Sequence, residues 1–209
     1  RQMCIRDSNC RFTGWQDTIF NGDPMTCNMK KLMLPDFFQA SEVPIVHKFY
    51  RNYFKDCYVC GDVDYIFGPN TAFFDHCEIH SIARVSEGKA YITAASTPAG
   101  QEFGLVFSHC RITGEEPDSV YLGRPWRDCA KTAFICCELG DHICPEGWQN
   151  WGKVRAEVLS DYIEYGNFGP GADCSGRSPL SRCLVNPEVE TYFSKENVLV
   201  GEDGWIPAE

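Results

Sequence analysis

Five short segments of this 209-residue chain share one frame built on cysteine. In each frame an apolar side chain follows the cysteine by two residues, and in four of them phenylalanine precedes it by three. The cysteines are Cys10, Cys57, Cys77, Cys110 and Cys137, and the phenylalanines are Phe54, Phe74, Phe107 and Phe134. The cysteines recur at intervals of 47, 20, 33 and 27 residues. A unit repeated at unequal intervals is typical of a solenoid whose coils carry loops of different lengths.

The frame predicts a parallel β-helix, an all-β solenoid that adds one strand at a time. Residues two apart on a strand face the same side, so the cysteine and the apolar residue of each frame can both point inward and stack on the next coil. Most of the thirteen cysteines would then be small buried hydrophobes. Aromatic residues at 13% and 18 glycines also favour strands and turns over a helical bundle.

Two other uses of cysteine remain open. A zinc site could be formed by Cys57, Cys60, Cys136, Cys137, His142 and Cys144. Residues three apart, like adjacent residues, face opposite sides of a strand, so these cysteines chelate only where the chain leaves strand geometry. Disulfides are possible among four cysteines that lie outside the frame, Cys129, Cys144, Cys174 and Cys183.

The chain reads as one domain. Residues 1–8 differ in character from the rest of the sequence and are predicted to be a non-native or disordered end, with the β-helix domain over 9–209. Residues 21–47 form an insertion broken by three prolines, predicted to be a loop over one face. Asn186-Pro187-Glu188 offers a helix cap, so a short helix over 187–195 is expected to close the solenoid.

The charge excludes one class of partner. The net charge of −10 lacks the basic field that nucleic-acid binding uses. No apolar run approaches the roughly 18 residues needed to cross a bilayer. We therefore expect neither nucleic acid nor membrane as a partner.

Two aspartates stand at the same offset in consecutive frames. CRFTGWQDTIF, from Cys10, and CYVCGDVDYIF, from Cys57, are identical at five of eleven positions, which places Asp17 and Asp64 seven residues after their cysteines. Neighbouring strands would hold them about 5 Å apart, where two negative charges repel by about 3 kcal/mol at an effective dielectric near 20. One carboxyl would then stay protonated as an acid while the other acts as nucleophile or base. The alternative is that both aspartates cap turns after glycine.

A third motif could support that pair. In Tyr121-Leu-Gly-Arg-Pro-Trp126, glycine and proline fix the backbone around Arg124. A guanidinium beside the aspartates would select which of them ionises, and Trp126 offers a flat face of the kind on which sugars stack. A surface salt bridge for Arg124 and plain packing for Trp126 are the alternatives.

The motifs GWQDTIF, VDYIFG, YLGRPW, GDHICPEGWQNW and EYGNFGPGA, taken in this order, resemble the pectin methylesterase (pectinesterase) family from about Asn9 to Trp205. The resemblance implies a right-handed parallel β-helix. It also implies hydrolysis of the methyl esters of pectin, releasing methanol and pectate, with no metal or other cofactor. The family has preceding coils and an upstream motif with a second glutamine, so we expect an N-terminally truncated catalytic domain whose activity needs direct testing.

The resemblance also implies a role for each site residue. Asp64 would be the nucleophile, Asp17 the acid and then the base, and Gln16 the donor to the oxyanion. Arg124 would orient Asp64 and keep it ionised. The residues implied to contact the sugar are Trp126, Tyr65 and Phe67. Tyr65 replaces the family's usual phenylalanine, and its added hydroxyl needs a partner.

Methylesterified homogalacturonan is the implied partner, and we predict a monomer. The alternatives are a polygalacturonase-like glycoside hydrolase, which also uses paired carboxylates, and a pectin-binding β-helix without catalysis. The resemblance implies a secreted or cell-surface protein. The many thiols, together with the lack of a signal segment in this sequence, leave a cytoplasmic enzyme as the alternative.

Overall fold

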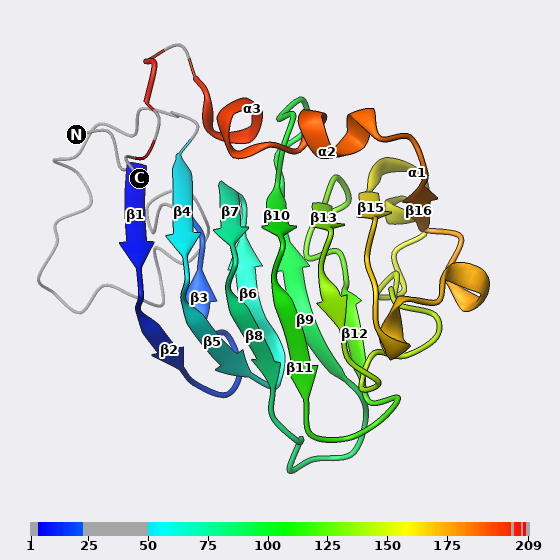
Figure 1. The fold of residues 1–209 in the computed structure, drawn as a ribbon. Helices are drawn as coiled ribbons and strands as arrows, with labels where there is room; N and C mark the ends of the chain where they lie inside the picture. The colour runs from blue at the N-terminus through cyan, green and yellow to red at the C-terminus, as the bar shows by residue number, and fades with distance from the viewer. Residues whose placement is uncertain (1–3, 23–49, 202, 206, 208–209) are drawn as a thin grey trace, which may run out of the picture.

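The coils of the chain wind through three sheets of parallel strands (Figure 1). The computed structural model describes residues 4–22, 50–201, 203–205 and 207. Within this part of the chain, a full coil contributes one short strand to each sheet, as β4, β5 and β6 do in succession. The predicted parallel β-helix is therefore confirmed.

The strands line up in coil order within each sheet. The seven-stranded sheet runs β1 (Cys4–Ser8), β4 (Arg51–Lys55), β7 (Thr71–Asp75), β10 (Leu105–Ser108), β13 (Lys131–Ile135), β15 (Asp161–Tyr165) and β16 (Ser181–Leu184). The five-stranded sheet runs β14 (Glu138–Leu139), β11 (Arg111–Gly114), β8 (Glu78–Ser81), β5 (Tyr58–Gly61) and β2 (Arg11–Thr13). The four-stranded sheet runs β12 (Val120–Gly123), β9 (Ala90–Ala95), β6 (Val63–Gly68) and β3 (Ile19–Phe20).

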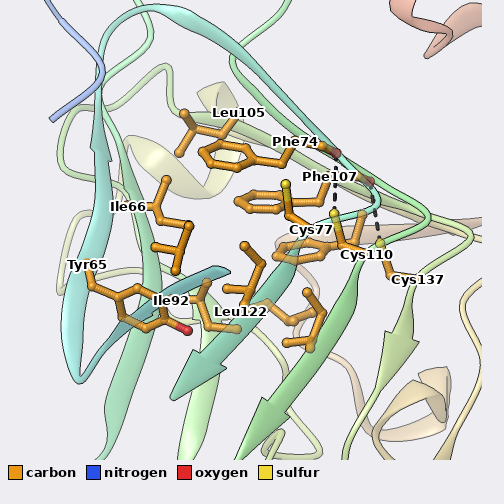
Figure 2. Close-up of a cluster of buried hydrophobic side chains, with 14 of the residues drawn as sticks. Tyr65, Ile66, Phe74, Cys77, Ile92, Leu105, Phe107, Cys110, Leu122 and Cys137 are labelled. Carbon is orange, nitrogen blue, oxygen red and sulfur yellow. Dashed lines mark hydrogen bonds between the residues drawn. The ribbon is translucent and has the colours of Figure 1, made fainter. Parts of the chain in front are cut away.

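The cysteine frame sets the register between coils. Its phenylalanines pair in sequence along the seven-stranded sheet, and the apolar residues that follow the cysteines pair along the five-stranded sheet. The rings of Phe54, Phe74, Phe107 and Phe134 stack with centroids 4.5, 4.7 and 4.5 Å apart. Identical positions thus repeat in space as they do in sequence, and they fill the interior of the solenoid (Figure 2).

Four of the frame cysteines are buried in this core, as predicted. The thiols of Cys77, Cys110 and Cys137 each donate a hydrogen bond to the phenylalanine carbonyl of the preceding coil, at 3.5, 3.3 and 3.5 Å. Figure 2 shows these bonds for Cys110 and Cys137. Cys10 is only partly buried, although it packs against the same cluster. The thiols therefore act as small core side chains that also satisfy backbone acceptors.

Among the four cysteines predicted as possible disulfide partners, one pair forms a disulfide, between Cys174 and Cys183. Cys129 and Cys144 are free thiols. The bridge lies near the C-terminal end of the solenoid, where 3-10 turns η2 (Pro170–Ala172) and η3 (Cys174–Gly176) precede β16. It closes the last described coil onto the strand that ends the sheet.

The outward face of the seven-stranded sheet is covered by the C-terminal segment. Two short helices, α2 (Glu188–Tyr192) and α3 (Lys195–Leu199), replace the single helix predicted over 187–195. The break comes at Ser194, whose extended backbone and side chain cap α3. Phe193 and Leu199 then pack on the outward-facing Phe73 and Val106. A third helix, α1 (Ala156–Leu159), lies in the loop before β15.

The N-terminal expectation needs a correction. Residues 4–8 do not lie outside the solenoid, because they form β1 and pair with β4 along its full length. Residues 4–8 are thus an ordered strand, and the other half of the expectation, that the end is non-native, stays a prediction. The insertion predicted over 21–47 lies almost entirely outside the described residues.

Candidate active site

Asp64 is a buried acid within β6 of the four-stranded sheet, only 5% exposed. The register between β6 and β9 shifts between Val63 and Ile66, so β6 bulges at Asp64 and Tyr65. The backbone of Asp64 has φ of 51°, in the left-handed region that aspartate tolerates better than most residues. A bulge of this kind re-aims a side chain, and here it takes Asp64 out of simple strand alternation.

Arg124 holds both oxygens of this carboxyl. Its Nε donates to Asp64 Oδ1 at 2.8 Å, and one terminal nitrogen donates to Oδ2 at 2.7 Å. The two side chains are 16% and 7% exposed, so the pair is largely shielded from water. A two-point contact of this kind fixes the plane of the carboxyl as well as its position. Arg124 therefore contacts Asp64, although the two residues are 60 positions apart in the sequence.

The guanidinium of Arg124 is itself held between two aromatic rings. It lies 3.9 Å from the ring centre of Tyr91 and 3.7 Å from that of Trp151. Behind it, Lys153 donates to the carbonyls of Pro125 and Trp126 at 2.6 and 3.1 Å, which ties the loop after β12 in place. Stacking leaves the edge of the guanidinium directed at the carboxyl and limits its freedom to turn.

Asp17 occupies the same position one coil earlier. The pairs Phe12 with Val59 and Ile19 with Ile66 flank it on either side at the offset that relates Asp17 to Asp64. Its backbone has φ of 57°, matching Asp64, and its N–H donates to the carbonyl of Val63 at 3.1 Å. Adjacent strands of a sheet lie about 4.8 Å apart. The two aspartates therefore stand in neighbouring coils at matching positions.

The electrostatics of the two carboxyls are linked. The pKa of Asp17 is raised above its ordinary value by burial of part of its side chain and then by the charge of Asp64, with Arg124 acting in the opposite direction. The pKa of Asp64 is also raised, because burial outweighs the lowering by the hydrogen bonds and charge of Arg124. The net pKa shift of Asp64 is therefore upward, which is opposite to the lowering that we expected from Arg124.

Gln16 lies next to Asp17 on a bend and is exposed to solvent. Strand alternation alone would send neighbouring side chains to opposite sides, but residues 15–17 leave the strand before β3 begins. The bend is possible because Gly61 lies against it: a Cβ there would come within 2.5 Å of the carbonyl oxygen of Trp15. Gln16 is thus an exposed residue directly before Asp17 on this bend.

Three aromatic rings lie together beside the acidic pair. Phe67 has its ring centre 5.0 Å from that of Phe20 and 5.7 Å from that of Trp126. Trp126 is half-buried, whereas Phe67 is 9% exposed, so Trp126 offers the larger free face. Phe20, which sequence reasoning did not single out, completes this group through its 6.5 Å contact with Trp126.

The prediction that Tyr65 contacts the sugar is wrong. Tyr65 is fully buried in the interior, packed in the main hydrophobic core, and cannot contact a sugar (Figure 2). Its hydroxyl is 2.9 Å from that of Ser81, which is the partner that the added oxygen requires. The bulge that turns Asp64 outward leaves the next side chain directed into the core.

Sequence reasoning also missed three residues that build the site, Tyr91, Trp151 and Lys153. The only signal for Trp151 was its place at the end of the motif GDHICPEGWQNW, to which no role was assigned, and neither Tyr91 in β9 nor Lys153 carried a signal of its own. An open groove of about 470 Å³ continues from Trp126, lined also by Thr97, Arg127 and Arg155. A second groove of about 470 Å³ lies under α2 on the seven-stranded sheet, and none of the predicted site residues lines it.

The zinc set considered from sequence does not assemble. Among the described residues, two groups of three possible ligands have their donor atoms within 4.8 Å of one another. These groups are His109, Cys136 and Glu190, and Glu164, Cys174 and Cys183. The first group shares only Cys136 with the set considered from sequence, and neither group includes Asp17 or Asp64.

Comparisons with known proteins agree on one family. A family model described as Pectinesterase matches residues 39–202. Pectinesterase 31 of Arabidopsis thaliana is 36% identical over 182 residues, covering 86% of this chain and 48% of that protein. Probable pectinesterase A of Aspergillus fumigatus is 35% identical over 180 residues, covering 82% of this chain and 45% of that protein. The chain thus spans about half the length of these curated relatives.

Solved structures give the same result. A pectin methylesterase from carrot superposes with a TM-score of 0.73 at 25% identity, covering 91% of this chain and 55% of that one. A pectin methylesterase in complex with a hexasaccharide superposes with a TM-score of 0.69 at 25% identity, covering 97% of this chain and 58% of that one. With the family model matching most of its length, the chain belongs to the pectinesterase family.

Proposed function

We propose that this protein is a pectin methylesterase that hydrolyses the methyl esters of galacturonate units to methanol and a free carboxylate. One observation carries the proposal. A buried aspartate, fixed at both oxygens by Arg124, stands one coil away from a second aspartate whose pKa it raises. Such a pair divides into one charged and one protonated carboxyl, which is what two-step ester hydrolysis needs.

In the first step the ionised Asp64 acts as nucleophile. One of its carboxylate oxygens bonds to the ester carbonyl carbon, and the carbonyl electrons move onto oxygen to form a tetrahedral intermediate. Collapse of this intermediate breaks the bond to the methoxy oxygen. Asp17 gives its proton to that oxygen, so methanol leaves neutral and an anhydride joins the substrate to Asp64.

In the second step Asp17, now ionised, acts as base. It takes a proton from water as the water oxygen bonds to the substrate carbonyl of the anhydride. Breaking the bond to Asp64 releases the galacturonate carboxyl group and restores the ionised nucleophile. The proton taken from water replaces the one that Asp17 gave to methanol, so the cycle closes with Asp17 protonated and Asp64 ionised.

The remaining residues support these steps. The exposed amide of Gln16 would donate to the negative oxygen of each tetrahedral intermediate. Arg124 would orient Asp64, and its hydrogen bonds and charge lower the pKa of Asp64, which burial raises. Trp126 and Phe67 would line the sugar subsite, with Trp126 supplying the exposed face. Tyr65 has no part in binding.

The open groove beside Trp126 supports a polymeric substrate, since it is not a closed pocket. A related pectin methylesterase has been solved with a hexasaccharide, which supports methylesterified homogalacturonan as the substrate here. We also infer that the protein is secreted or held at the cell surface, which the Cys174–Cys183 disulfide favours. Of the described helices, none is long and apolar enough to cross a membrane. A monomer stays a prediction.

The test is to measure methanol and new reducing ends from highly methylated homogalacturonan. We expect methanol without reducing ends, and loss of methanol release in Asp64→Asn. Asp62→Asn is the matched control, because Asp62 accepts a hydrogen bond from Val63 N–H, which asparagine can also do. Reducing ends would indicate a glycoside hydrolase. Binding of the polymer by the folded chain without methanol release would indicate a carbohydrate-binding β-helix.

A further inference from the structure

One turn of the solenoid carries a column of residues in the left-handed region. The column consists of Asn9, Asp56, His76, His109, Cys136 and Gly166, with φ between 52° and 63°. Each of the first five donates its backbone N–H to a carbonyl in the next coil. The accepting carbonyl belongs to the residue just before the next member of the column. Their side chains therefore leave equivalent points of successive coils, one strand spacing apart.

Two successive members of this column are good metal ligands, and α2 brings a third. Glu190 reaches over the turn, with its Oε1 3.7 Å from Nε2 of His109. The ligand atoms of His109, Cys136 and Glu190 all lie within 4.8 Å of one another. Ligands arranged tetrahedrally around zinc at normal bond lengths are about 3.3–3.6 Å apart. Small side-chain rotations would bring the three atoms to these separations.

The histidine ring is oriented for this role. Its Nδ1 is 2.9 Å from the hydroxyl of Ser108, which leaves Nε2 on the side of Glu190. The ring also stacks on His76, with centres 5.2 Å apart and planes within 8°. A partner on the second ring nitrogen and a packed ring are what zinc-binding histidines usually have.

The thiol is also accessible to an ion. Cys136 is half-buried and forms no disulfide. The next member of the column is Gly166, where a Cβ would lie 3.0 Å from the Cys136 sulfur. Because glycine has no side chain, the column is left uncrowded on that side of the thiol. The other three-residue group in the described part of the chain lacks this property, since Cys174 and Cys183 are joined to each other.

We propose that His109, Cys136 and Glu190 form a zinc site, with water as the fourth ligand. Nitrogen, thiolate and carboxylate together suit a borderline-soft divalent ion, and the two negative groups balance its charge. Binding breaks the S–H bond of Cys136, forms a sulfur–metal bond and releases the proton to solvent. The ion would join α2 to the turn of the solenoid, so its role is structural. This inference does not depend on the proposed esterase activity.

The test titrates the intact chain with Co²⁺ and follows the near-ultraviolet absorption band of a cobalt thiolate. We expect a band that Zn²⁺ removes, that is absent in Cys136→Ser, and that needs at least about tenfold more Co²⁺ in His109→Asn or Glu190→Gln. Asparagine suits the left-handed backbone at position 109. Cys129→Ser and Glu188→Gln are the matched controls, changing a thiol and an α2 carboxylate outside the site, and both should bind normally.

A second measurement uses thermal unfolding. Zn²⁺ should raise the melting temperature of the wild-type chain, because an ion that binds only the folded state stabilises it. The rise should be lost in Cys136→Ser and kept in Cys129→Ser. The proposal is overturned if the folded wild-type chain gives no cobalt band. It is overturned equally if the band survives in Cys136→Ser or disappears in Cys129→Ser.

Discussion

The first two frames of the solenoid are close copies in sequence, yet their aspartates differ in surroundings. Asp64 is buried in a strand that lies between β3 and β9, and Arg124 holds both of its oxygens. Asp17 is exposed and lies just before β3, the edge strand of the same described sheet. The same position in the repeat thus brings the two acids into neighbouring coils, and their different neighbours support the different roles that we propose for them.

The same contrast separates the core from the site. Where the repeat is kept, as in the phenylalanine stack, the side chains point inward and stabilise the fold. Where it is broken by a bulge and left-handed residues, a carboxyl leaves the core side and becomes available for chemistry. The proposed active site is therefore a local departure from the rule that builds the solenoid.

The largest effect that tests this contrast should come from Asp17→Asn. We expect methanol release to fall by about 10²–10⁴-fold, since the general acid and base is lost. The rate of the wild type should fall as pH rises through the raised pKa of Asp17, because the acid must start protonated. That descending limb should vanish in the variant. An unchanged pH profile would contradict the assignment.

Lengthening each acid by one methylene sharpens the comparison. Asp64→Glu should lower methanol release by about 10²-fold, because a shift of about 1 Å misplaces a nucleophile held by Arg124. Asp17→Glu should lower methanol release by less than about tenfold, since an exposed side chain can adjust its position. The two rates, measured on the same substrate, would contradict the account if they were equal or reversed.

Replacing Arg124 should move the acidic limb of the profile. Asp64 must be ionised to attack, so the rate rises with pH through its pKa. Arg124 lowers that pKa, so Arg124→Gln should shift the limb to higher pH and reduce the rate at neutral pH by about tenfold. Arg124→Lys keeps a positive charge but loses the two-point contact, so its acidic limb and its rate should lie between those of the wild type and Arg124→Gln. A limb that stays in place would remove Arg124 from this role.

The smallest effect is expected at Tyr65. Tyr65→Phe removes the hydroxyl that pairs with Ser81 and should lower the free energy of unfolding by about 1 kcal/mol. Methanol release at saturating and limiting substrate should not change, because the ring stays in the core. A raised KM would instead restore Tyr65 as a sugar contact.

Much of the fold could be predicted because its rule is local and repeated. A cysteine, an apolar residue and a phenylalanine at fixed offsets specify which side chains face inward, and parallel pairing carries them from coil to coil. The neighbouring placement of Asp17 and Asp64 follows from the same rule. For these features, equal offset in the sequence means adjacency in space.

The rest depends on contacts that no offset encodes. Arg124 meets Asp64 although the two are 60 positions apart in the sequence, and Trp151 reaches the same guanidinium from another loop. The inward direction of Tyr65 depends on a bulge, which shifts side-chain alternation by one residue. Each of these is settled by tertiary structure.

Coupling between the two acids can be measured without any reaction. Carboxyl carbon NMR of the chain would follow the titration of Asp17 in the wild type and in Asp64→Asn. Since the charge of Asp64 raises the pKa of Asp17, removing that charge should lower it. A pKa of Asp17 that is the same in both proteins would contradict the shared pair on which the mechanism depends.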